Sequence, residues 1–368
     1  MFLLFIFTLV IFIQIFYFFF LFGKFSFSRY KAIQSENQPP ISVIICAKNE
    51  EENLKNILPF IAQQNYPHFE IILIDDASTD DTFQVMKDFK EELESSLNIS
   101  QIQILSLTKS YGKKHALDKG IRSSSNKFIL LTDADCKPIS KDWITKMSLN
   151  FKNNITIILG YGAYQKIKKS FLNKLIRFET LMTAVQYFSY ASYGMPYMGV
   201  GRNIAYSKNE FIRVNGFNTH NHIKSGDDDL LINQMATKYN TSICTDQDAF
   251  TISIPKTNYR DWFNQKRRHI TTATNYKKAH QFLLGLFYVS QFLFWFLTVF
   301  LIFKGINLHF VLLLIFIRFL FWYTTIYRST KKLNETDLLF LAPILETVII
   351  CTQLCIFIVN KVSPPKKW

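Results

Sequence analysis

The sequence predicts a mixed α/β domain with a mainly parallel sheet, flanked at both ends of the chain by membrane helices. Short β-branched runs alternate with segments of helical periodicity from residue 41 onward, which is typical of β-α-β units. Long apolar segments, almost free of charge, lie at the two ends of the 368-residue chain. We therefore expect a soluble domain over residues 41–276 with membrane segments on either side.

The N-terminal segment, Met1 to Phe22, contains no charged residue and is long enough to cross a hydrocarbon core of about 30 Å. We expect a transmembrane helix over residues 1–23 and a linker over 24–40. The segment lacks the basic start and the small-residue cleavage site of a secretory signal. Three basic residues follow it and place this end in the cytoplasm by the positive-inside rule: Lys24, Arg29 and Lys31.

Three more apolar segments follow the soluble part, over about 282–303, 308–327 and 338–359. They define a membrane region over residues 277–362 and leave a tail over 363–368. The basic loop between the second and third of them would lie inside, in agreement with the positive-inside rule. The basic tail would lie outside, against the rule, so the last segment either spans despite its charges or is re-entrant. We favour four spans. The charges are Arg328, Lys331 and Lys332 in the loop, and Lys361, Lys366 and Lys367 in the tail.

Arg318 and Glu346 fall inside predicted spans, where ionisable groups are costly and have partners or line a cavity. One interpretation is an acceptor path. The other, which we favour, is an ion pair that fixes helix packing, or snorkelling of Arg318 to the surface.

The soluble part begins with a strand over 41–46, followed by a helix over 50–62 and a second strand over 70–75. Helices over 82–93 and 113–121 and strands over 102–107 and 127–132 continue the alternation, which indicates right-handed crossovers. Ligands bind beyond the carboxyl ends of such strands. Polar clusters stand at those ends: Lys48-Asn49-Glu50, Asp75-Asp76 and Asp133-Ala134-Asp135.

A net charge of +14 is compatible with nucleic acid, acidic lipid or a phosphate-bearing substrate as partner. Many of the basic residues lie beside the apolar segments, which favours an anionic membrane surface. We find no nucleic-acid-binding motif. The five cysteines show no paired CxxC spacing, so we expect reduced thiols without a disulfide framework or a zinc site.

Asp133 and Asp135 flank a small residue after an apolar strand. Two carboxylates at this spacing can approach one cation, and oxygen ligands suit Mg²⁺ or Mn²⁺, which in turn bind diphosphate. The alternative is a capping turn, since Asp pairs are common in turns.

Two further clusters have both a structural and a functional interpretation. Asp75-Asp76-Ala77-Ser78 closes a strand, so Ser78 or Asp80 could cap the next helix while Asp76 accepts from a nucleoside base. Gly112-Lys113-Lys114 opens a helix, where a lysine favours phosphate, although a solvated charged turn is the simpler interpretation.

Ser225-Gly226-Asp227-Asp228-Asp229 is the densest acidic cluster. Mutual repulsion of its carboxylates can raise one pKa, which suits a general base. An acidic helix N-terminus is the alternative, and we expect Asp229 to fill that role while Asp227 and Asp228 face the cleft.

These clusters, in this order, resemble the inverting family-2 glycosyltransferases of GT-A fold over about residues 41–276. The ordered set includes Gln265 and Arg268, which match a Gln-x-x-Arg-Trp motif in which His269 replaces the Trp. The alternative for this basic, aromatic segment is an interfacial anchor beside the spans. Phe171 to Met198, by resemblance, brings the acceptor to the site, although an amphipathic helix explains it equally well.

The resemblance implies roles for the matching residues. Asp228, with Asp227 as the alternative, would be the general base, and Asp135 with Asp133 would hold the metal. The donor-binding residues would be Ala47, Glu50, Asp76, Lys113, Asp133, Gln265 and Arg268.

The resemblance implies inverting single displacement from a nucleotide sugar, with UDP the favoured nucleotide, to a lipid-linked or cell-envelope glycan acceptor. The expected location is a bacterial plasma membrane, with the catalytic domain on the cytoplasmic side. A processive polysaccharide synthase is the alternative, although three C-terminal spans are few for a channel. A catalytically silent membrane scaffold and a nucleotidyltransferase are more distant alternatives. The sequence leaves the sugar, the acceptor and the oligomeric state open.

Overall fold

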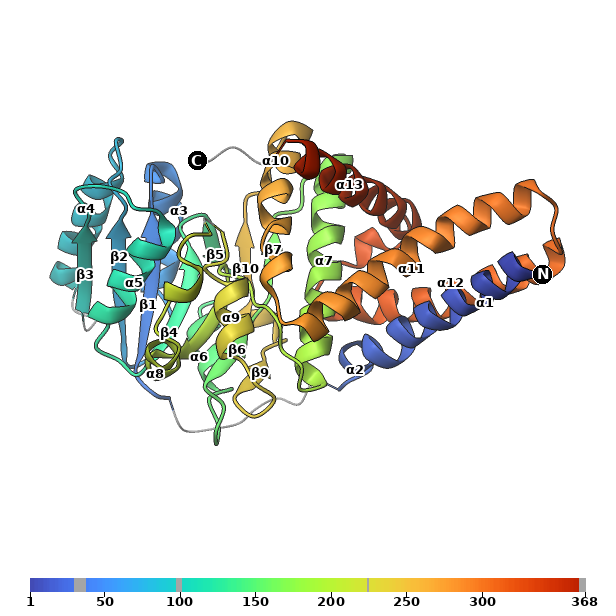
Figure 1. Ribbon diagram of the computed structural model, residues 1–368. Helices are drawn as coiled ribbons and strands as arrows, with labels where there is room; N and C mark the ends of the chain where they lie inside the picture. Colours follow the sequence, from blue (N-terminus) through green and yellow to red (C-terminus); the bar gives the residue numbers. More distant parts are fainter. Residues whose placement is uncertain (30–37, 97–100, 224, 364–368) are drawn as a thin grey trace. The chain divides into compact units, whose positions relative to one another are not determined.

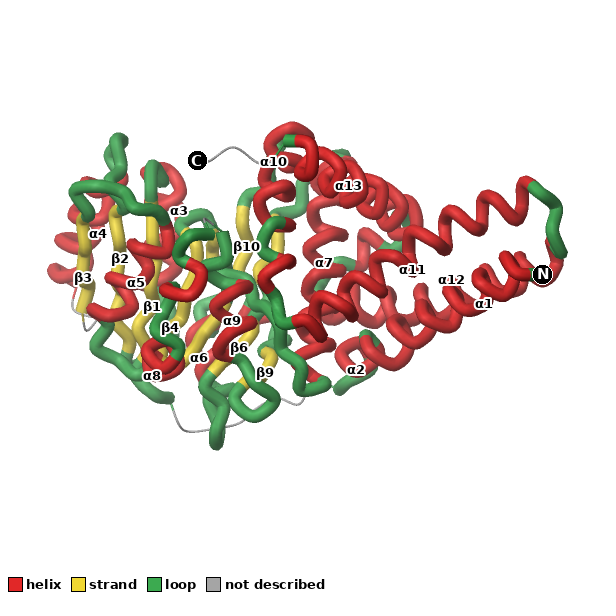
Figure 2. The backbone as a smooth tube through the Cα atoms, in the orientation of Figure 1, coloured by secondary structure: helices red, strands yellow, loops and turns green. Residues whose placement is uncertain are grey.

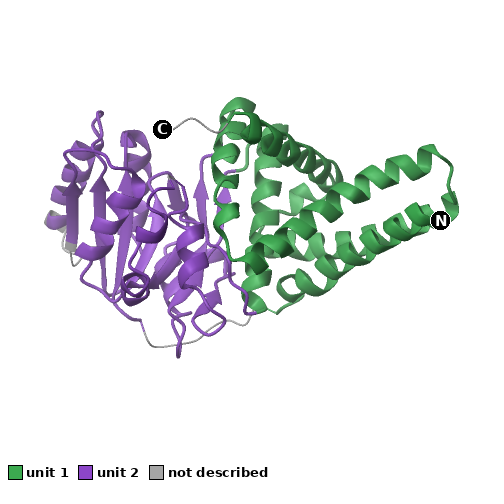
Figure 3. Ribbon diagram, viewed as in Figure 1, with its two compact units in different colours: residues 1–29, 166–193, 256–368 green, residues 30–165, 194–255 purple. Residues whose placement is uncertain are grey.

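The computed structural model describes residues 1–29, 38–96, 101–223 and 225–363. Residues 30–37 of the expected linker and 364–368 of the tail, with the predicted charges Lys31, Lys366 and Lys367, lie outside the described residues. The chain forms two compact units (Figure 3). The α/β unit comprises residues 30–165 and 194–255, and the helical unit comprises 1–29, 166–193 and 256–368. The predicted boundary at residue 276 therefore remains a prediction, and the two units are described separately.

The core of the α/β unit is a seven-stranded sheet of order β3-β2-β1-β4-β8-β6-β9. Strands β1 to β4 are parallel, β8 runs antiparallel to both β4 and β6, and β9 is parallel to β6. The strands are β1 (Ile41–Ala47), β2 (Phe69–Asp75), β3 (Gln101–Ser106), β4 (Phe128–Asp133), β6 (Ile157–Leu159), β8 (Ile204–Ser207) and β9 (Thr241–Ile243). A small second sheet has the order β5-β10-β7, from β5 (Cys136–Pro138), β7 (Gly162–Tyr164) and β10 (Thr251–Ser253).

Burial explains why these strands form. Every residue of β2 is buried, and β1 is buried except for Cys46, as expected for parallel strands covered on both faces. Apolar residues of the covering helices, such as Leu54 and Met86, share one core with β1 and β2. Figure 1 shows the first four strands side by side between helices. The helices are α3 (Glu51–Ala62), α4 (Thr82–Ser96), α5 (Lys113–Ser123), α6 (Trp143–Ser148), α8 (Lys208–Arg213) and α9 (Asp229–Met235), with 3₁₀ turns at Asn218–His220 and Gln247–Ala249.

The helical unit contains four helices long and apolar enough to cross a membrane: Phe2–Ser26, Lys278–Phe303, Leu308–Lys332 and Ala342–Val362 (Figure 2). The first consists of α1 (Phe2–Ile15), a π-helical stretch (Phe16–Leu21) and α2 (Gly23–Ser26), and the others are α11, α12 and α13. The remaining elements are α7 (Phe171–Ser192), α10 (Tyr259–Ile270) and 3₁₀ turns at Ala273–Asn275 and Thr336–Leu338. Phe7, Phe294 and Leu314 belong to the core that joins α1, α11 and α12. The four predicted apolar helices are therefore present.

Arg318 and Glu346 form an ion pair of 2.8 Å within this bundle, which is the interpretation that the sequence favoured. Arg318 is fully buried, and its Nε donates to Gln14 Oε1 at 2.7 Å. Glu346 Oε1 also accepts from Gln291 and from the Trp322 indole. The pair thus links side chains from all four long helices.

Candidate functional site

The carboxyl ends of the central strands bring several predicted residues to one edge of the sheet. Ala47, the last residue of β1, lies opposite Asp75 in the register of β1 and β2, and its carbonyl accepts from the Asp76 N–H at 2.9 Å. Cys46 lies opposite Asp133 in the register of β1 and β4. The backbone therefore places Ala47, Asp76 and Asp133 next to one another, as the parallel pattern predicted.

The two aspartates that end β2 have different surroundings. Asp75 accepts from the Ser78 N–H at 3.1 Å and from the Ser106 hydroxyl at 3.4 Å, so it supports the local turn. Asp76 is 3% exposed, and its Oδ2 accepts from the Ser110 hydroxyl at 2.8 Å. Its Oδ1 has no hydrogen-bond partner among the described residues. Such an acceptor can receive an N–H from a ligand.

The loops that follow β1 and β2 are joined by hydrogen bonds. Asn49 has a positive φ of 55°, its N–H donates to the Ser78 hydroxyl at 3.0 Å, and its side chain accepts from the Thr79 N–H at 2.8 Å. Glu50 donates its N–H to Thr82 Oγ1 at 2.8 Å. At the N-terminal end of α4, Asp80 accepts from the Thr82 N–H at 3.1 Å. Of the two capping candidates, Asp80 therefore binds the helix, while the Ser78 hydroxyl binds the Asn49 N–H. Glu50 thereby has a fixed backbone at the site's edge.

Lys113 begins α5 after Gly112, whose φ of 99° is unfavourable for other residues. Its ammonium lies 2.6 Å from Asp133 and 2.9 Å from Asp227. Burial alone would lower the pKa of Lys113, but the two carboxylates hold it well above its usual value. The side chain is still 41% exposed, so this cation is accessible to a ligand while it joins two acidic clusters.

Asp133, Asp135 and Cys136 form a group that could hold a metal ion, with one ligand atom from each lying within 4.8 Å of the others. Burial, reinforced by the charge of Asp133, raises the pKa of Asp135. Burial also holds the pKa of the Cys136 thiol well above its usual value, and this thiol lies 2.9 Å from the Ser253 hydroxyl. The two carboxylates therefore fit a hard cation such as Mg²⁺ or Mn²⁺, whereas the protonated thiol does not suit one.

The three consecutive aspartates have separate environments. Asp227 pairs with Lys113, which lowers its pKa although burial opposes this. Asp228 accepts from the Gly201 N–H and the Asp229 N–H, both at 2.7 Å. Burial, followed by the charges of Asp227 and Asp229, raises the pKa of Asp228 to about 7. Asp229 is the buried first residue of α9, so it supplies the acidic helix N-terminus as expected, and Asp228 is the N-cap residue.

Gly201 allows the acids to approach the backbone closely. A Cβ atom at this position would lie 3.5 Å from Asp228 Oδ2 and 3.7 Å from Lys113 Nζ. A side chain here would therefore occupy the space between the base candidate and the cation.

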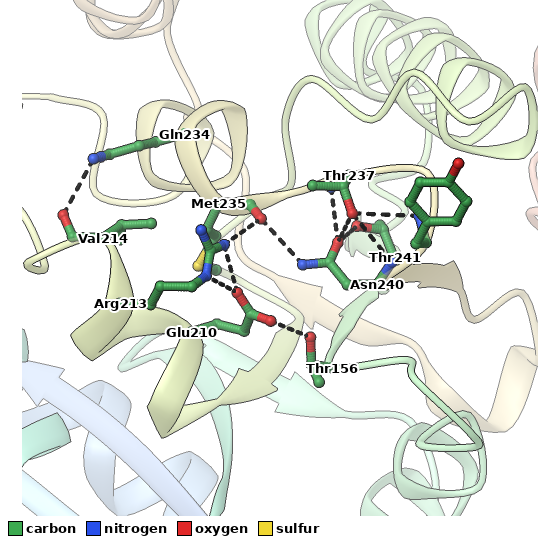
Figure 4. Close-up of polar contacts among 10 residues, drawn as sticks. Thr156, Glu210, Arg213, Val214, Gln234, Met235, Thr237, Asn240 and Thr241 are labelled. Carbon is green, nitrogen blue, oxygen red and sulfur yellow. Dashed lines mark hydrogen bonds and ion pairs between the residues drawn. The ribbon is translucent and has the colours of Figure 1, made fainter.

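The far end of α9 is held by a polar network (Figure 4). Glu210 accepts from Arg213 and from Thr156 Oγ1, and Arg213 also donates to the Met235 carbonyl at 3.1 Å. Asn240 donates to the same carbonyl at 3.1 Å. Because Met235 ends the helix that starts next to Asp228, this network stabilises the support of the acidic cluster.

Arg202 lies beside the metal candidates Asp133 and Asp135, within the segment 199–203 that resembles an acceptor-side strand of the family. Its guanidinium lies 4.3 Å from the centre of the Tyr164 ring and donates to the Ala163 carbonyl at 3.3 Å. Burial opposes its charge, but Tyr164, Cys136 and Asp135 raise its pKa. The spacing of Arg202 in the sequence does not indicate that it lies near Asp133 and Asp135, because this proximity arises from the tertiary structure.

Gln265 and Arg268 belong to α10 in the helical unit, so their predicted contact with the donor stays a prediction. Their spacing of three residues puts them on one side of the helix. Within that unit Lys266 pairs with Glu179 of α7 at 2.7 Å, and Arg267 donates to Asn360 of α13 at 2.8 Å. Burial lowers the pKa of Arg268.

Comparison with known proteins shows what this chain is similar to in sequence and in fold. Residues 42–217 match the profile "Glycosyl transferase family 2". The chain is 32% identical over 140 residues to the poly-beta-1,6-N-acetyl-D-glucosamine synthase of Staphylococcus epidermidis, over 38% of this chain and 32% of that protein. It is 30% identical over 110 residues to the poly(ribitol-phosphate) beta-N-acetylglucosaminyltransferase TarS of Staphylococcus aureus, over 29% of this chain and 17% of TarS. The chain thus spans about a third or less of the length of these relatives.

A solved structure shares the fold. The mannosyltransferase PcManGT from Pyrobaculum calidifontis, in complex with GDP-Man and Mn²⁺, matches 93% of this chain over 99% of its own, with a TM-score of 0.57 and 16% identity. The mixed α/β, GT-A-like fold expected from the sequence is confirmed. Residues 42–217, which are 176 of the 368 residues, are thus similar to glycosyltransferase family 2, and the chain shares its fold with a solved glycosyltransferase.

Proposed function

We propose that the protein transfers a sugar from a nucleotide-sugar donor, with UDP the favoured nucleotide, to the hydroxyl of a lipid-linked or cell-envelope glycan acceptor. The observation that carries the proposal is the convergence of two acidic clusters on one cation. Lys113 contacts Asp133 of the metal candidates and Asp227 of the base candidates. A donor diphosphate and an acceptor hydroxyl need these two kinds of group close together.

The nucleoside lies, in this proposal, against the ends of β1 and β2. Asp76 offers its unpartnered Oδ1 to a base N–H. Ala47 ends β1 beside it, and its carbonyl accepts from the Asp76 N–H. Glu50 holds the adjacent loop, and Gln265 and Arg268 supply further contacts to the donor. An arginine suits this task because its guanidinium can bind two phosphate oxygens at once.

The metal candidates and Lys113 face the diphosphate. A Mg²⁺ or Mn²⁺ ion bound by Asp133 and Asp135 would supply positive charge for the diphosphate as it departs. Lys113 would stabilise the same developing charge by a hydrogen bond from its ammonium.

Asp228 acts as the general base. A base must be able to bind a proton near neutral pH, and burial raises the pKa of Asp228 to about 7. Asp227 is less suited, since its pKa is lowered and it already pairs with Lys113. The proton of the acceptor hydroxyl passes to Asp228, and the acceptor oxygen forms a bond to the anomeric carbon. The bond from that carbon to the diphosphate oxygen breaks, its electron pair leaves with the nucleoside diphosphate, and the configuration at carbon inverts.

We further propose that the four long helices cross a bacterial plasma membrane and that the α/β unit faces the cytoplasm. Lys24 lies in the last turn of the first helix and Arg29 follows it, and Arg328, Lys331 and Lys332 lie at the end of the third helix, which supports this orientation by the positive-inside rule. A cytoplasmic site has access to nucleotide sugars, and the membrane offers a lipid-linked acceptor.

The test is nucleoside diphosphate release from a panel of nucleotide sugars by the detergent-solubilised protein, with membrane lipid extract as acceptor source. We expect Mn²⁺-dependent release from one donor, loss of release with retained donor binding in Asp228→Asn, and unchanged release in Asp248→Asn, which alters an exposed carboxylate. A wild-type protein that neither releases nor binds any donor in the presence of metal would rule out the proposal.

A processive polysaccharide synthase is a second candidate, and the similarity to the poly-beta-1,6-N-acetyl-D-glucosamine synthase favours it. The two candidates differ in product length. Mass spectrometry of the product made with excess donor would show one added sugar for single transfer and a ladder of added sugars for processive synthesis.

A further inference from the structure

Lys114, the second residue of α5, is a buried lysine. It is 5% exposed, whereas its neighbour Lys119 on the same helix is exposed. The sequence allowed a solvated charged turn here. The structure excludes that interpretation for Lys114, because the side chain is enclosed by the α/β unit.

The ammonium of Lys114 binds backbone rather than a carboxylate. It donates to the carbonyl of His220 at 2.8 Å and to the carbonyl of Ile223 at 2.9 Å. The His220 carbonyl also accepts from the Ile223 N–H at 3.1 Å, so the ammonium closes a turn at this point. The described contacts of Lys114 include no ion pair, and burial lowers its pKa to about 8. Burying a cation is costly unless hydrogen bonds and nearby charges offset the loss of water. Here the two carbonyls accept from the ammonium, and the charges of Asp227, Asp229 and Asp228 favour its charged form.

The segment that Lys114 holds leads directly to the acidic cluster. Asp227 and Asp228 follow Ile223 by four and five residues. Asp227 is bound by Lys113, the residue that precedes Lys114, and Asp228 is bound by the Gly201 N–H. Two consecutive lysines at the start of α5 therefore bind the same part of the chain. Lys113 binds the Asp227 carboxylate, and Lys114 binds the backbone carbonyls of His220 and Ile223.

We infer that Lys114 is a positioning residue, which fixes residues 220–223 through the His220 and Ile223 carbonyls and so sets the place of Asp228 relative to Lys113. The inference rests on the proposed function, in which Asp228 is the base. Lys114 acts through Asp228 and contacts neither donor nor acceptor. A displacement of the base by about 1 Å lowers a rate by about a hundredfold, whereas donor binding depends mainly on other residues.

The test compares Lys114→Met with Lys114→Arg and with Lys119→Met, an exposed control on the same helix. For each variant we would measure kcat and KM for the active donor, binding of UDP with Mn²⁺, and amide hydrogen exchange over 220–228. We expect Lys114→Met to lower kcat by about tenfold to a hundredfold, to change UDP binding by less than about threefold and to speed exchange over the segment. Arg retains a buried cationic donor, so we expect it to recover most of kcat, and Lys119→Met to match the wild type.

Three outcomes would overturn the inference. They are wild-type kcat in a folded Lys114→Met, an equal loss of UDP binding and kcat in that variant, or no recovery of kcat in Lys114→Arg. If Lys114→Met does not fold, Lys114→Gln carries the test, since its amide still donates to a carbonyl without a charge. We then expect Lys114→Gln to lower kcat by up to about tenfold and to change UDP binding by less than about threefold, and wild-type kcat in this variant would overturn the inference. A wild-type protein without any transfer activity would instead count against the proposed function, so the two failures are distinguishable.

Discussion

The ammonium of Lys113 lies 2.6 Å from a carboxylate oxygen of Asp133. This contact joins α5 to the end of β4, two elements whose side chains the sequence assigned to different clusters. Because the same ammonium also binds Asp227, removal of one charge disturbs both the metal candidates and the base candidates.

Lys113→Met should therefore lower nucleoside diphosphate release strongly. We expect a decrease in kcat of about 10²–10³-fold, the range seen when one donor to a developing negative charge is lost. The measurement is steady-state release with the active donor, beside Lys119→Met as the exposed control. A Lys113→Met protein that is folded, binds UDP and keeps more than half of the wild-type kcat would contradict the role.

The pH dependence of kcat should follow Asp228. The base works in its ionised form, and its pKa is raised to about 7, so the rate should rise as pH increases through about 7 and fall about tenfold per unit below it. Asp229→Asn removes a negative charge that raises this pKa. The acidic limb should then move to lower pH, because Asp228 loses its proton more easily.

The profile would be measured from pH 5 to pH 9 in the wild type, in Asp229→Asn and in the exposed control Asp248→Asn. Asn at 229 can still accept from the Leu230 N–H through its amide oxygen, which preserves the start of α9. A limb that stays in place or moves to higher pH in Asp229→Asn would count against Asp228 as the base.

Asp135 should govern the metal requirement. We expect EDTA to abolish release and excess Mn²⁺ to restore it, since the two carboxylates fit an oxygen-preferring cation. Asp135→Asn weakens the site without emptying it of oxygen ligands, so it should raise the Mn²⁺ concentration for half-maximal rate by at least about tenfold. Full activity of the wild type in EDTA would show that the pair has another use.

The central strands were predictable because burial on both faces leaves a continuous apolar run. The expected strand 41–46 is β1 at 41–47, and the expected strand 70–75 is β2 at 69–75. The long apolar helices were predictable for a related reason, since a helix that is apolar all round leaves an uninterrupted stretch of sequence. The strands β5, β6 and β7 have three residues each, too few to show any periodicity.

The candidate site was predictable only as a set of polar clusters at strand ends. The parallel pattern implied that Asp76 and Asp133 share one edge. It did not imply that Lys113 binds both Asp133 and Asp227, because Asp227 is more than ninety residues away from the other two in the sequence and is brought to them by the tertiary fold. The environment of Asp228 and the burial of Lys114 also depend on tertiary contacts, the first with the Gly201 N–H and the second with the carbonyls of His220 and Ile223.

Glu346→Ala should destabilise the helical unit, because it leaves Arg318 buried without its counter-ion. Loss of one partner of a buried pair costs about 3–5 kcal/mol, whereas replacement of both partners by apolar residues is often neutral. We therefore expect a clear decrease in the Tm of Glu346→Ala in detergent and a recovery in the double variant Arg318→Met with Glu346→Leu. Activity of the double variant separates the two interpretations of the pair. If it retains both Tm and transfer, the pair serves helix packing alone. If it retains Tm but loses transfer to a lipid acceptor while UDP binding persists, the polar network takes part in acceptor access.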